Sequence, residues 1–148
     1  MIVAVFIIND VGKSRLVRFY DHTPLNQQNS LVQEVYSLLK TRNKEDCCFI
    51  PWKMSEYSGQ MKIIYRHFAS LYFAMLVDTA ESELAILDLI QVLVQVLDNC
   101  FENVCELDLI YHFDRVNYIL DELVIGGCVL ESNLDSVLKA IKETSQIK

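Results

Sequence analysis

The segment from Leu84 to Leu97 constrains the fold most strongly, because apolar residues surround nearly its whole circumference. It follows Ser82, a typical helix N-cap. The polar residues within it and directly after it recur every three or four positions, at Asp88, Gln91, Gln95 and Asp98. This spacing predicts a helix with one narrow polar stripe, the inverse of an ordinary surface helix.

Such a helix needs cover on more than one side. Its own sheet can cover one flank, and other helices of the chain or a partner protein must cover the rest. We expect a partner, since a chain of 148 residues has few further elements to supply. The interface residues that we expect are Ile86, Leu89, Ile90 and Leu93.

Five segments before this helix have the pattern of β-strands. Their residue ranges are 2–8, 14–20, 47–52, 61–66 and 71–77. The first is apolar throughout, which is typical of a strand buried on both faces. A turn at Asn9-Asp10-Val11-Gly12 joins it to the second as a hairpin, and Pro51 favours an edge position for the third.

Helices dominate the rest of the chain. Thr23-Pro24 predicts the start of a helix that extends to about Lys40, with Thr23 as N-cap. A continuous helix is expected from about Glu106 to the stop at Gly126-Gly127, and a last one from Ser132. Residues 1–148 are therefore predicted to form a single α+β domain.

Composition and charge exclude several classes of protein. With 52% hydrophobic and 22% charged residues, the chain is neither disordered nor of low complexity. The formal net charge of −7 argues against a nucleic-acid-binding protein. Residues 1–66 carry 9 Lys and Arg against 6 Asp and Glu, whereas residues 67–148 carry 4 against 14. The first part could face an acidic partner.

Targeting and redox signals indicate a cytoplasmic protein. The apolar run from Met1 to Ile8 lacks a preceding basic segment and is too short to span a bilayer. The cysteines, Cys47, Cys48, Cys100, Cys105 and Cys128, are odd in number and lie among apolar neighbours. We expect reduced, buried thiols.

No motif predicts an enzyme, a cofactor or a metal site. Gly12-Lys13-Ser14 resembles the end of a phosphate-binding loop, but Ile7 stands where its first glycine is required. Cys100 and Cys105 lack the spacing of zinc knuckles. The three histidines are not accompanied by a Gly-x-Ser-x-Gly motif, although a triad assembled in space stays open.

Three segments resemble the clathrin-adaptor small chains, the sigma-adaptin family. Ile63-Ile64-Tyr65-Arg66, then four variable positions and Leu71-Tyr72-Phe73, resembles the family signature. Asn103-Val104-Cys105-Glu106-Leu107-Asp108-Leu109 and Gly12-Lys13-Ser14-Arg15-Leu16 match two further family segments. Glu81-Ser82-Glu83-Leu84 resembles the sigma subunits of the third adaptor-protein complex.

The resemblance implies a longin-like fold, a five-stranded antiparallel sheet flanked by helices. It also implies a heterotetramer with a large delta-type subunit as direct partner and with beta and mu subunits. That complex would associate peripherally with the cytosolic face of Golgi, endosomal and vesicle membranes. It would serve protein transport toward the lysosome or vacuole.

The resemblance further implies binding of acidic dileucine signals, Asp/Glu-x-x-x-Leu-Leu/Ile, in the cytosolic tails of membrane cargo. Arg15 would lie near the acidic residue of the signal, and Asn103 would contact its backbone. The pockets for the two leucines would be lined by Ala69, Leu71, Val94, Val104 and Leu109.

Two other functions stay open at this point. The chain could be the small subunit of another clathrin-adaptor or coatomer-type complex. It could also be an isolated longin-type module that binds a small GTPase or a SNARE protein.

Overall fold

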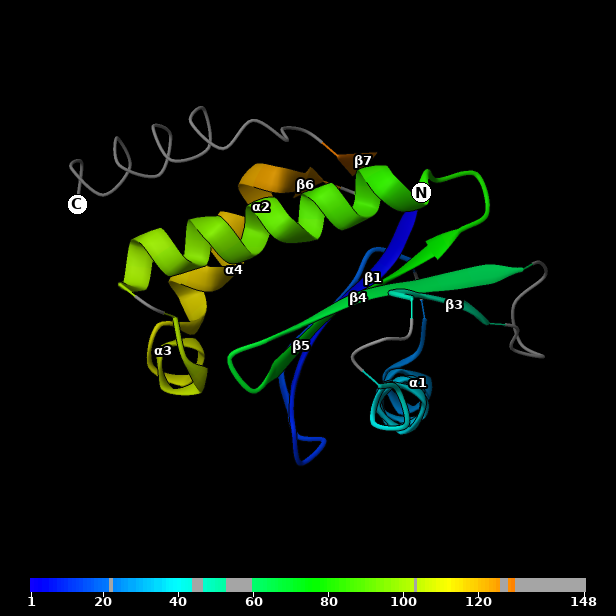
Figure 1. Ribbon diagram of the computed structural model, residues 1–148, viewed down its shortest axis with the longest axis horizontal. Coiled ribbons are helices and arrows are strands. Elements are labelled where there is room, and N and C mark those ends of the chain that lie inside the picture. Colours follow the sequence, from blue (N-terminus) through cyan, green and yellow to red (C-terminus); the bar gives the residue numbers. More distant parts are fainter. Residues whose placement is uncertain (22, 44–46, 53–59, 103, 126–127, 130–148) are drawn as a thin grey trace.

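The computed structural model describes residues 1–21, 23–43, 47–52, 60–102, 104–125 and 128–129. Its centre is a five-stranded antiparallel sheet with the spatial order β2-β1-β5-β4-β3 (Figure 1). The strands are β1 (Ile2–Asn9), β2 (Ser14–Phe19), β3 (Phe49–Trp52), β4 (Met61–Phe68) and β5 (Leu71–Asp78). The predicted α+β fold with a five-stranded antiparallel sheet is confirmed.

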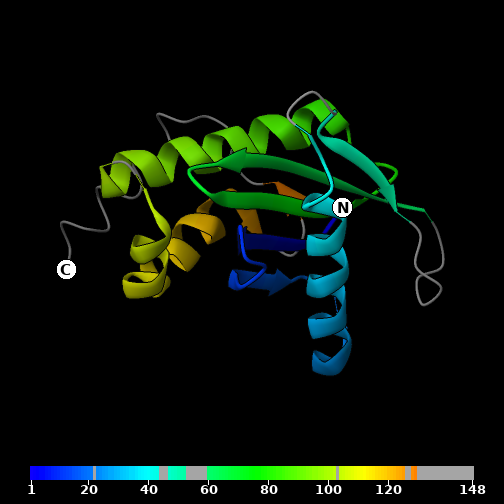
Figure 2. The same cartoon turned by 60° about the horizontal axis from the view of Figure 1, so that its bottom comes forward.

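Helices cover both faces of this sheet. They are α1 (Leu25–Leu39), α2 (Glu83–Phe101), α3 (Glu106–Tyr111) and α4 (Phe113–Leu123). Helix α1 packs on one face, whereas α2 and α4 lie together over the other (Figures 1 and 2). A separate two-stranded ribbon, β6 (Val124–Ile125) with β7 (Cys128–Val129), follows α4.

Strand β1 is buried along its whole length, as its apolar sequence predicts. It lies between β2 and β5, so both of its edges are hydrogen-bonded. Phe6 and Ile8 point into the cluster on the α1 face, whereas Val5 and Ile7 point into the cluster under α2 and α4. The sheet therefore has two hydrophobic cores, one on each side, and each core requires its own layer of helix.

The partner interface predicted on α2 is wrong. Ile86, Leu89, Ile90 and Leu93 are 0–2% exposed and pack inside the chain's own core. Helix α2 contacts β4 and β5 on one side and α4 on another, and these contacts cover its inner surface. By length and hydropathy alone α2 would also pass as a membrane-spanning helix. Its buried face explains that composition as core packing.

The helix predicted from Glu106 is interrupted. His112 has φ −121° and ψ 40°, outside the helical region, and it separates α3 from α4. The break lets α3 pack against β2 while α4 packs against α2. Neither Gly nor Pro marks this position, so local sequence could not predict it. The helix predicted from Ser132 lies outside the described residues.

Local signals at the helix starts were partly correct. The Ser82 hydroxyl accepts a hydrogen bond from the Ala85 amide at 3.4 Å, as an N-cap residue does. Pro24, rather than Thr23, occupies the N-cap of α1, and the Thr23 hydroxyl bonds to Asp21 instead. Cys47 and Cys105 are free but exposed, so the expectation of buried thiols is wrong for these two.

Strand β3 forms one edge of the sheet, as Pro51 predicted. Pro51 has no amide hydrogen to offer at this edge. The Cys47 thiol donates to the Phe49 carbonyl oxygen, with 3.4 Å between sulfur and oxygen. On its inner side β3 is held to α1, since the Trp52 indole donates to a Glu34 carboxylate oxygen at 2.9 Å.

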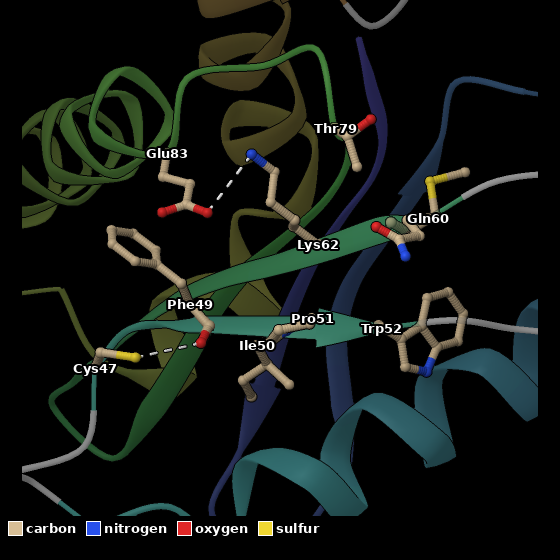
Figure 3. Close-up of a pocket in the computed structure, with 10 residues that line it drawn as sticks. Cys47, Phe49, Ile50, Pro51, Trp52, Gln60, Lys62, Thr79 and Glu83 are labelled. Atoms are coloured by element: carbon tan, nitrogen blue, oxygen red, sulfur yellow. Dashed lines mark hydrogen bonds and ion pairs between the residues drawn. The ribbon is translucent and has the colours of Figure 1, made fainter.

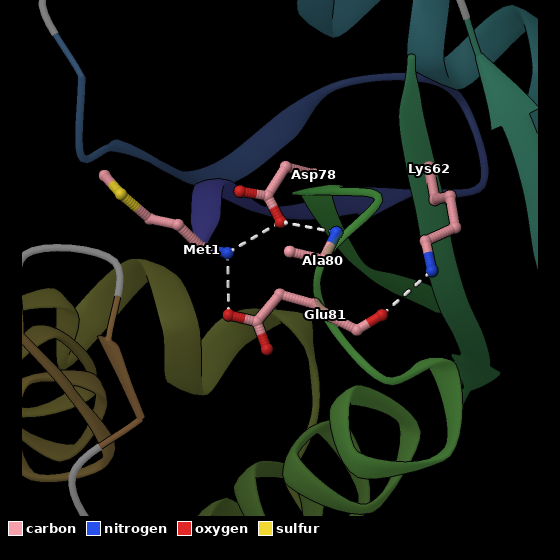
Figure 4. Close-up of polar contacts among 5 residues, drawn as sticks. All are labelled: Met1, Lys62, Asp78, Ala80 and Glu81. Carbon is pink, nitrogen blue, oxygen red and sulfur yellow. Dashed lines mark hydrogen bonds and ion pairs between the residues drawn. The ribbon is translucent and has the colours of Figure 1, made fainter. Parts of the chain in front are cut away.

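A polar cluster joins the start of β1 to the connection between β5 and α2 (Figure 4). The amino group of Met1 lies 2.8 Å from Asp78 Oδ1 and 2.7 Å from Glu81 Oε1. Partial burial disfavours this ammonium group, but its hydrogen bonds to the two carboxylates outweigh that effect and raise its pKa. Lys62 Nζ donates to the Glu81 carbonyl at 2.9 Å and closes the cluster.

Substitutions on α2 distinguish a core role from an interface role. We expect Ile90→Ala to lower the free energy of unfolding of the full chain by about 2–5 kcal/mol, because it leaves a cavity in the core. Leu84→Ala, at a side chain 69% exposed on the same helix, should change it by less than about 0.5 kcal/mol. Urea unfolding measures both, and equal stabilities for the two variants would contradict the core assignment.

Candidate functional site

The turn between β1 and β2 and the turn between β4 and β5 lie at the same end of the sheet, and this end carries the candidate site. Asn9, the last residue of β1, pairs with Leu71, the first residue of β5. Leu71 also pairs with Phe68, so Ala69 and Ser70 alone form the turn between β4 and β5. Both have positive φ, 49° and 64°, as a type I′ turn requires.

Asn9 organises the turn between β1 and β2, and it is the one polar residue that is buried in the described part of the chain. Its Oδ1 accepts hydrogen bonds from the amides of Val11 and Lys13, at 3.0 and 2.8 Å. Its Nδ2 donates to Glu106 Oε1 at 2.7 Å. One buried side chain therefore shapes the turn and also reaches α3.

Arg15 meets the same carboxylate oxygen. Its Nε donates to Glu106 Oε1 at 2.6 Å, and the two side chains are 20% and 29% exposed. Hydrogen bonds from Asn9 and then from Arg15 lower the pKa of Glu106, and the nearby charge of Lys13 acts in the same direction. The terminal Nη groups of Arg15 have no hydrogen-bond partner among the described residues. Glu106 is thus ionised at neutral pH and holds only one side of the guanidinium.

The predicted pocket residues are brought together, but as a closed cluster. Leu71, Val94, Val104 and Leu109 belong to one hydrophobic core and are 0–4% exposed. Ala69 is exposed in the adjacent turn. Asn103 lies outside the described residues. The four core side chains leave no apolar surface for a leucine, so binding there would require a local opening.

Sequence reasoning missed the roles of Asn9 and Glu106. Glu106 stood inside a family segment without a role, and Asn9 was interpreted only as part of a turn. Their contact joins residues 97 positions apart, and the Arg15 contact joins residues 91 positions apart. The available signals were two acidic residues, Glu106 and Asp108, in the first turn of a predicted helix, and basic residues in the first hairpin.

A cavity of about 590 Å³ lies at the edge strand β3, away from the cluster around Arg15 (Figure 3). Phe49, Pro51 and Trp52 give it an apolar wall, and Lys62 and Glu83 add an ion pair of 3.6 Å. The Cys47 thiol at its rim bonds to a backbone carbonyl. No histidine is among its described lining residues, so the cavity does not pair a thiol with a base.

A second cavity, of about 260 Å³, places Cys48 and His67 in one lining. His67 Nε2 lies 2.9 Å from Asp10 Oδ1, and its ring stacks on Tyr72 with the centroids 4.4 Å apart. Within the described residues no hydrogen bond joins Cys48 to His67. The histidine therefore has an acidic partner but no bonded nucleophile, and the arrangement is not a catalytic triad.

Metal chemistry has no support in the described ranges. No group of three or more His, Cys, Asp or Glu side chains within them is arranged to hold a metal ion.

Comparisons with known proteins agree on one family. The profile of the clathrin adaptor complex small chain family matches residues 1–148. The human AP-3 complex subunit sigma-2 is 48% identical over the whole chain, which spans 77% of that protein. The AP-3 complex subunit sigma of Dictyostelium discoideum is 50% identical over 135 residues, 90% of this chain and 79% of that protein.

A more distant relative and a structure extend this agreement. The AP-3 complex subunit sigma of Arabidopsis thaliana is 43% identical over the whole chain and 89% of that protein. A chain in a homology model of the full-length AP-3 complex, in a stretched open conformation, superposes with a TM-score of 0.76. It is 38% identical, and the match covers 99% of this chain and 95% of that chain.

The lowered pKa of Glu106 predicts how its contacts contribute to stability at different pH. Because the pKa of Glu106 is lower in the folded than in the unfolded chain, its ionised form stabilises the fold when the pH is above the ordinary pKa of 4.5. This contribution disappears as the pH falls through the lowered folded-state pKa. Wild type should therefore exceed Glu106→Gln in urea midpoint at neutral pH, and the difference should shrink as the pH falls below the ordinary pKa of 4.5 and through the lowered folded-state pKa.

Asp114→Asn is the control for this measurement. Asp114 is exposed and does not contact Arg15, so its variant removes the same charge without touching the pair. A midpoint difference between wild type and Glu106→Gln that stays constant across the pH range would contradict the assignment.

Proposed function

This chain belongs to the clathrin adaptor complex small-chain family, and we propose that it helps to recognise acidic dileucine signals in the cytosolic tails of membrane cargo. It is the small, sigma-type subunit of an AP-3 adaptor complex and acts in vesicle trafficking. Small chains of these complexes are structural trafficking proteins rather than enzymes. In our proposal the chain assembles with a large delta-type subunit and with beta and mu subunits on Golgi, endosomal and vesicle membranes.

One observation supports the signal-binding proposal most directly. Arg15 lies at the end of the sheet where Leu71, Val94, Val104 and Leu109 gather, and its Nη groups face no described partner. A signal of the form Asp/Glu-x-x-x-Leu-Leu carries one negative charge and two large apolar side chains at a fixed spacing. A cation beside an apolar cluster is complementary to both features.

The expected affinity is moderate. Burial of two leucine side chains contributes roughly 1.5–3 kcal/mol each, and a partly exposed charge pair adds up to about 1 kcal/mol. The loss of translational and rotational freedom opposes binding. Because the apolar cluster is closed in the free chain, opening it lowers the apparent affinity further. Micromolar binding by one site is expected, with several sites acting together at a membrane.

A different surface from α2 is available for a neighbouring subunit. With the inner side of α2 buried, exposed apolar side chains gather on α3 and at the start of α4, at Leu107, Ile110, Tyr111 and Phe113. Acidic residues flank them, at Asp108 and Asp114. We propose that this patch contacts the large subunit, at a surface of that subunit that is apolar and has a basic border.

Substitution within the pocket tests signal recognition. In the purified heterotetramer that contains the full chain, Val104→Ser should weaken binding of an acidic dileucine peptide by about tenfold, because it places a hydroxyl in an apolar pocket. Fluorescence anisotropy with a labelled peptide measures this affinity. Val32→Ser, also at a buried valine but on α1 across the sheet, is the matched control and should bind as wild type does. Equal affinities for Val104→Ser and wild type would refute the proposed pocket.

Substitution on the patch tests the subunit contact. Tyr111 is 76% exposed, so Tyr111→Asp should leave the fold intact and reduce recovery of the large subunit with the tagged chain at least fivefold. Leu25→Asp, at a side chain 73% exposed on α1, should not reduce that recovery. Quantitative mass spectrometry of the purified material gives both ratios, and undiminished recovery with Tyr111→Asp would place the contact elsewhere.

A further inference from the structure

Glu106 forms an ion pair with Arg15, the cation that the acidic residue of the proposed signal would bind. Its Oε1 accepts hydrogen bonds from both Asn9 and Arg15, at 2.7 and 2.6 Å. The lowered pKa of Glu106 keeps it negatively charged at neutral pH. The guanidinium of Arg15 is therefore already balanced by a carboxylate of the same chain. An incoming acidic side chain meets an ion pair instead of an isolated cation.

Helix α3, which carries Glu106, is held weakly by its apolar side chains. Leu109 is its only buried residue, whereas Leu107, Ile110 and Tyr111 point outward. It is only six residues long: it begins after the N-cap Cys105 and ends at the non-helical His112. The preceding helix α2 ends at Glu102, which has a left-handed backbone at φ 51°. The contacts of Glu106 with Asn9 and Arg15 are thus a principal link between α3 and the hairpin of β1 and β2.

We propose that Glu106 determines specificity by competing, within the chain, with the acidic residue of a dileucine signal for Arg15. This inference rests on the proposed function. The carboxylate of the signal takes over the interaction with the guanidinium, and Lys13, which lies close enough to influence Glu106 electrostatically, adds a second positive charge. Competition reduces the benefit that the acidic residue gives to a signal, so the preference for acidic over neutral signals is smaller than an unpaired Arg15 would give.

The test removes the charge of Glu106 and keeps its shape. Glu106→Gln retains an oxygen that can accept from Asn9 Nδ2 and Arg15 Nε, and it leaves the pairing of Cys105 with Asp108 at the start of α3 unchanged. Asp88→Asn removes one negative charge from an exposed position on α2 that does not contact Arg15 and lies outside the proposed subunit contact. Both variants are prepared in the complete heterotetramer.

Two labelled peptides report the competition. One carries Glu four residues before Leu-Leu, and the other carries Gln there. We expect Glu106→Gln to bind the acidic peptide about fivefold more tightly than wild type and the neutral peptide equally well. The gain should shrink as ionic strength rises. Asp88→Asn should change neither affinity by more than about twofold.

The outcomes separate this inference from the proposed function. In one outcome, wild type binds the acidic peptide, Val104→Ser binds it more weakly, and Glu106→Gln binds it no more tightly than wild type. The competition is then refuted and signal recognition stands. A gain of equal size for both peptides also refutes the competition, because it would act through the apolar pocket. If wild type binds neither peptide, the proposed function fails and the competition fails with it.

Discussion

Burial of the central strands on both faces is the constraint from which the rest of the structure follows. Strand β1 exposes almost nothing, and β5 beside it is nearly as covered. A sheet that is apolar on both sides needs two layers of helix. Helix α1 provides one layer and α2 with α4 the other. The unusual hydrophobicity of α2 arises because β4, β5 and α4 all contact it.

Local patterns in the sequence predicted the elements well, because short-range physics decides them. Alternating and continuous apolar runs marked the five strands, and Ser82 marked the start of α2. The same patterns could not say what covers an apolar side chain. Ile86 and Ile90 were assigned to a partner although α4 and the sheet cover them. The break at His112 could not be predicted for a similar reason, since no helix-breaking residue marks it and the two helices that it separates pack on different neighbours, α3 on β2 and α4 on α2.

In the candidate site, too, the sequence indicated some of the residues but not the contacts between them. Arg15 and the apolar set around Val104 were found through family resemblance, and the fold brings them to one end of the sheet. The polar network that organises them was not predictable. Asn9 and Arg15 reach Glu106 across more than 90 residues of sequence, and no periodicity encodes such a pairing. Only the folded chain shows that the cation is already engaged.

The outer edge of strand β3 is protected against pairing with a second copy of the chain. An uncovered strand edge invites the same edge of another copy to extend the sheet, which leads to aggregation. Here Pro51 removes a donor from that edge, and the Cys47 thiol occupies the carbonyl of Phe49. Strand-to-strand pairing between two copies of the chain is thereby discouraged.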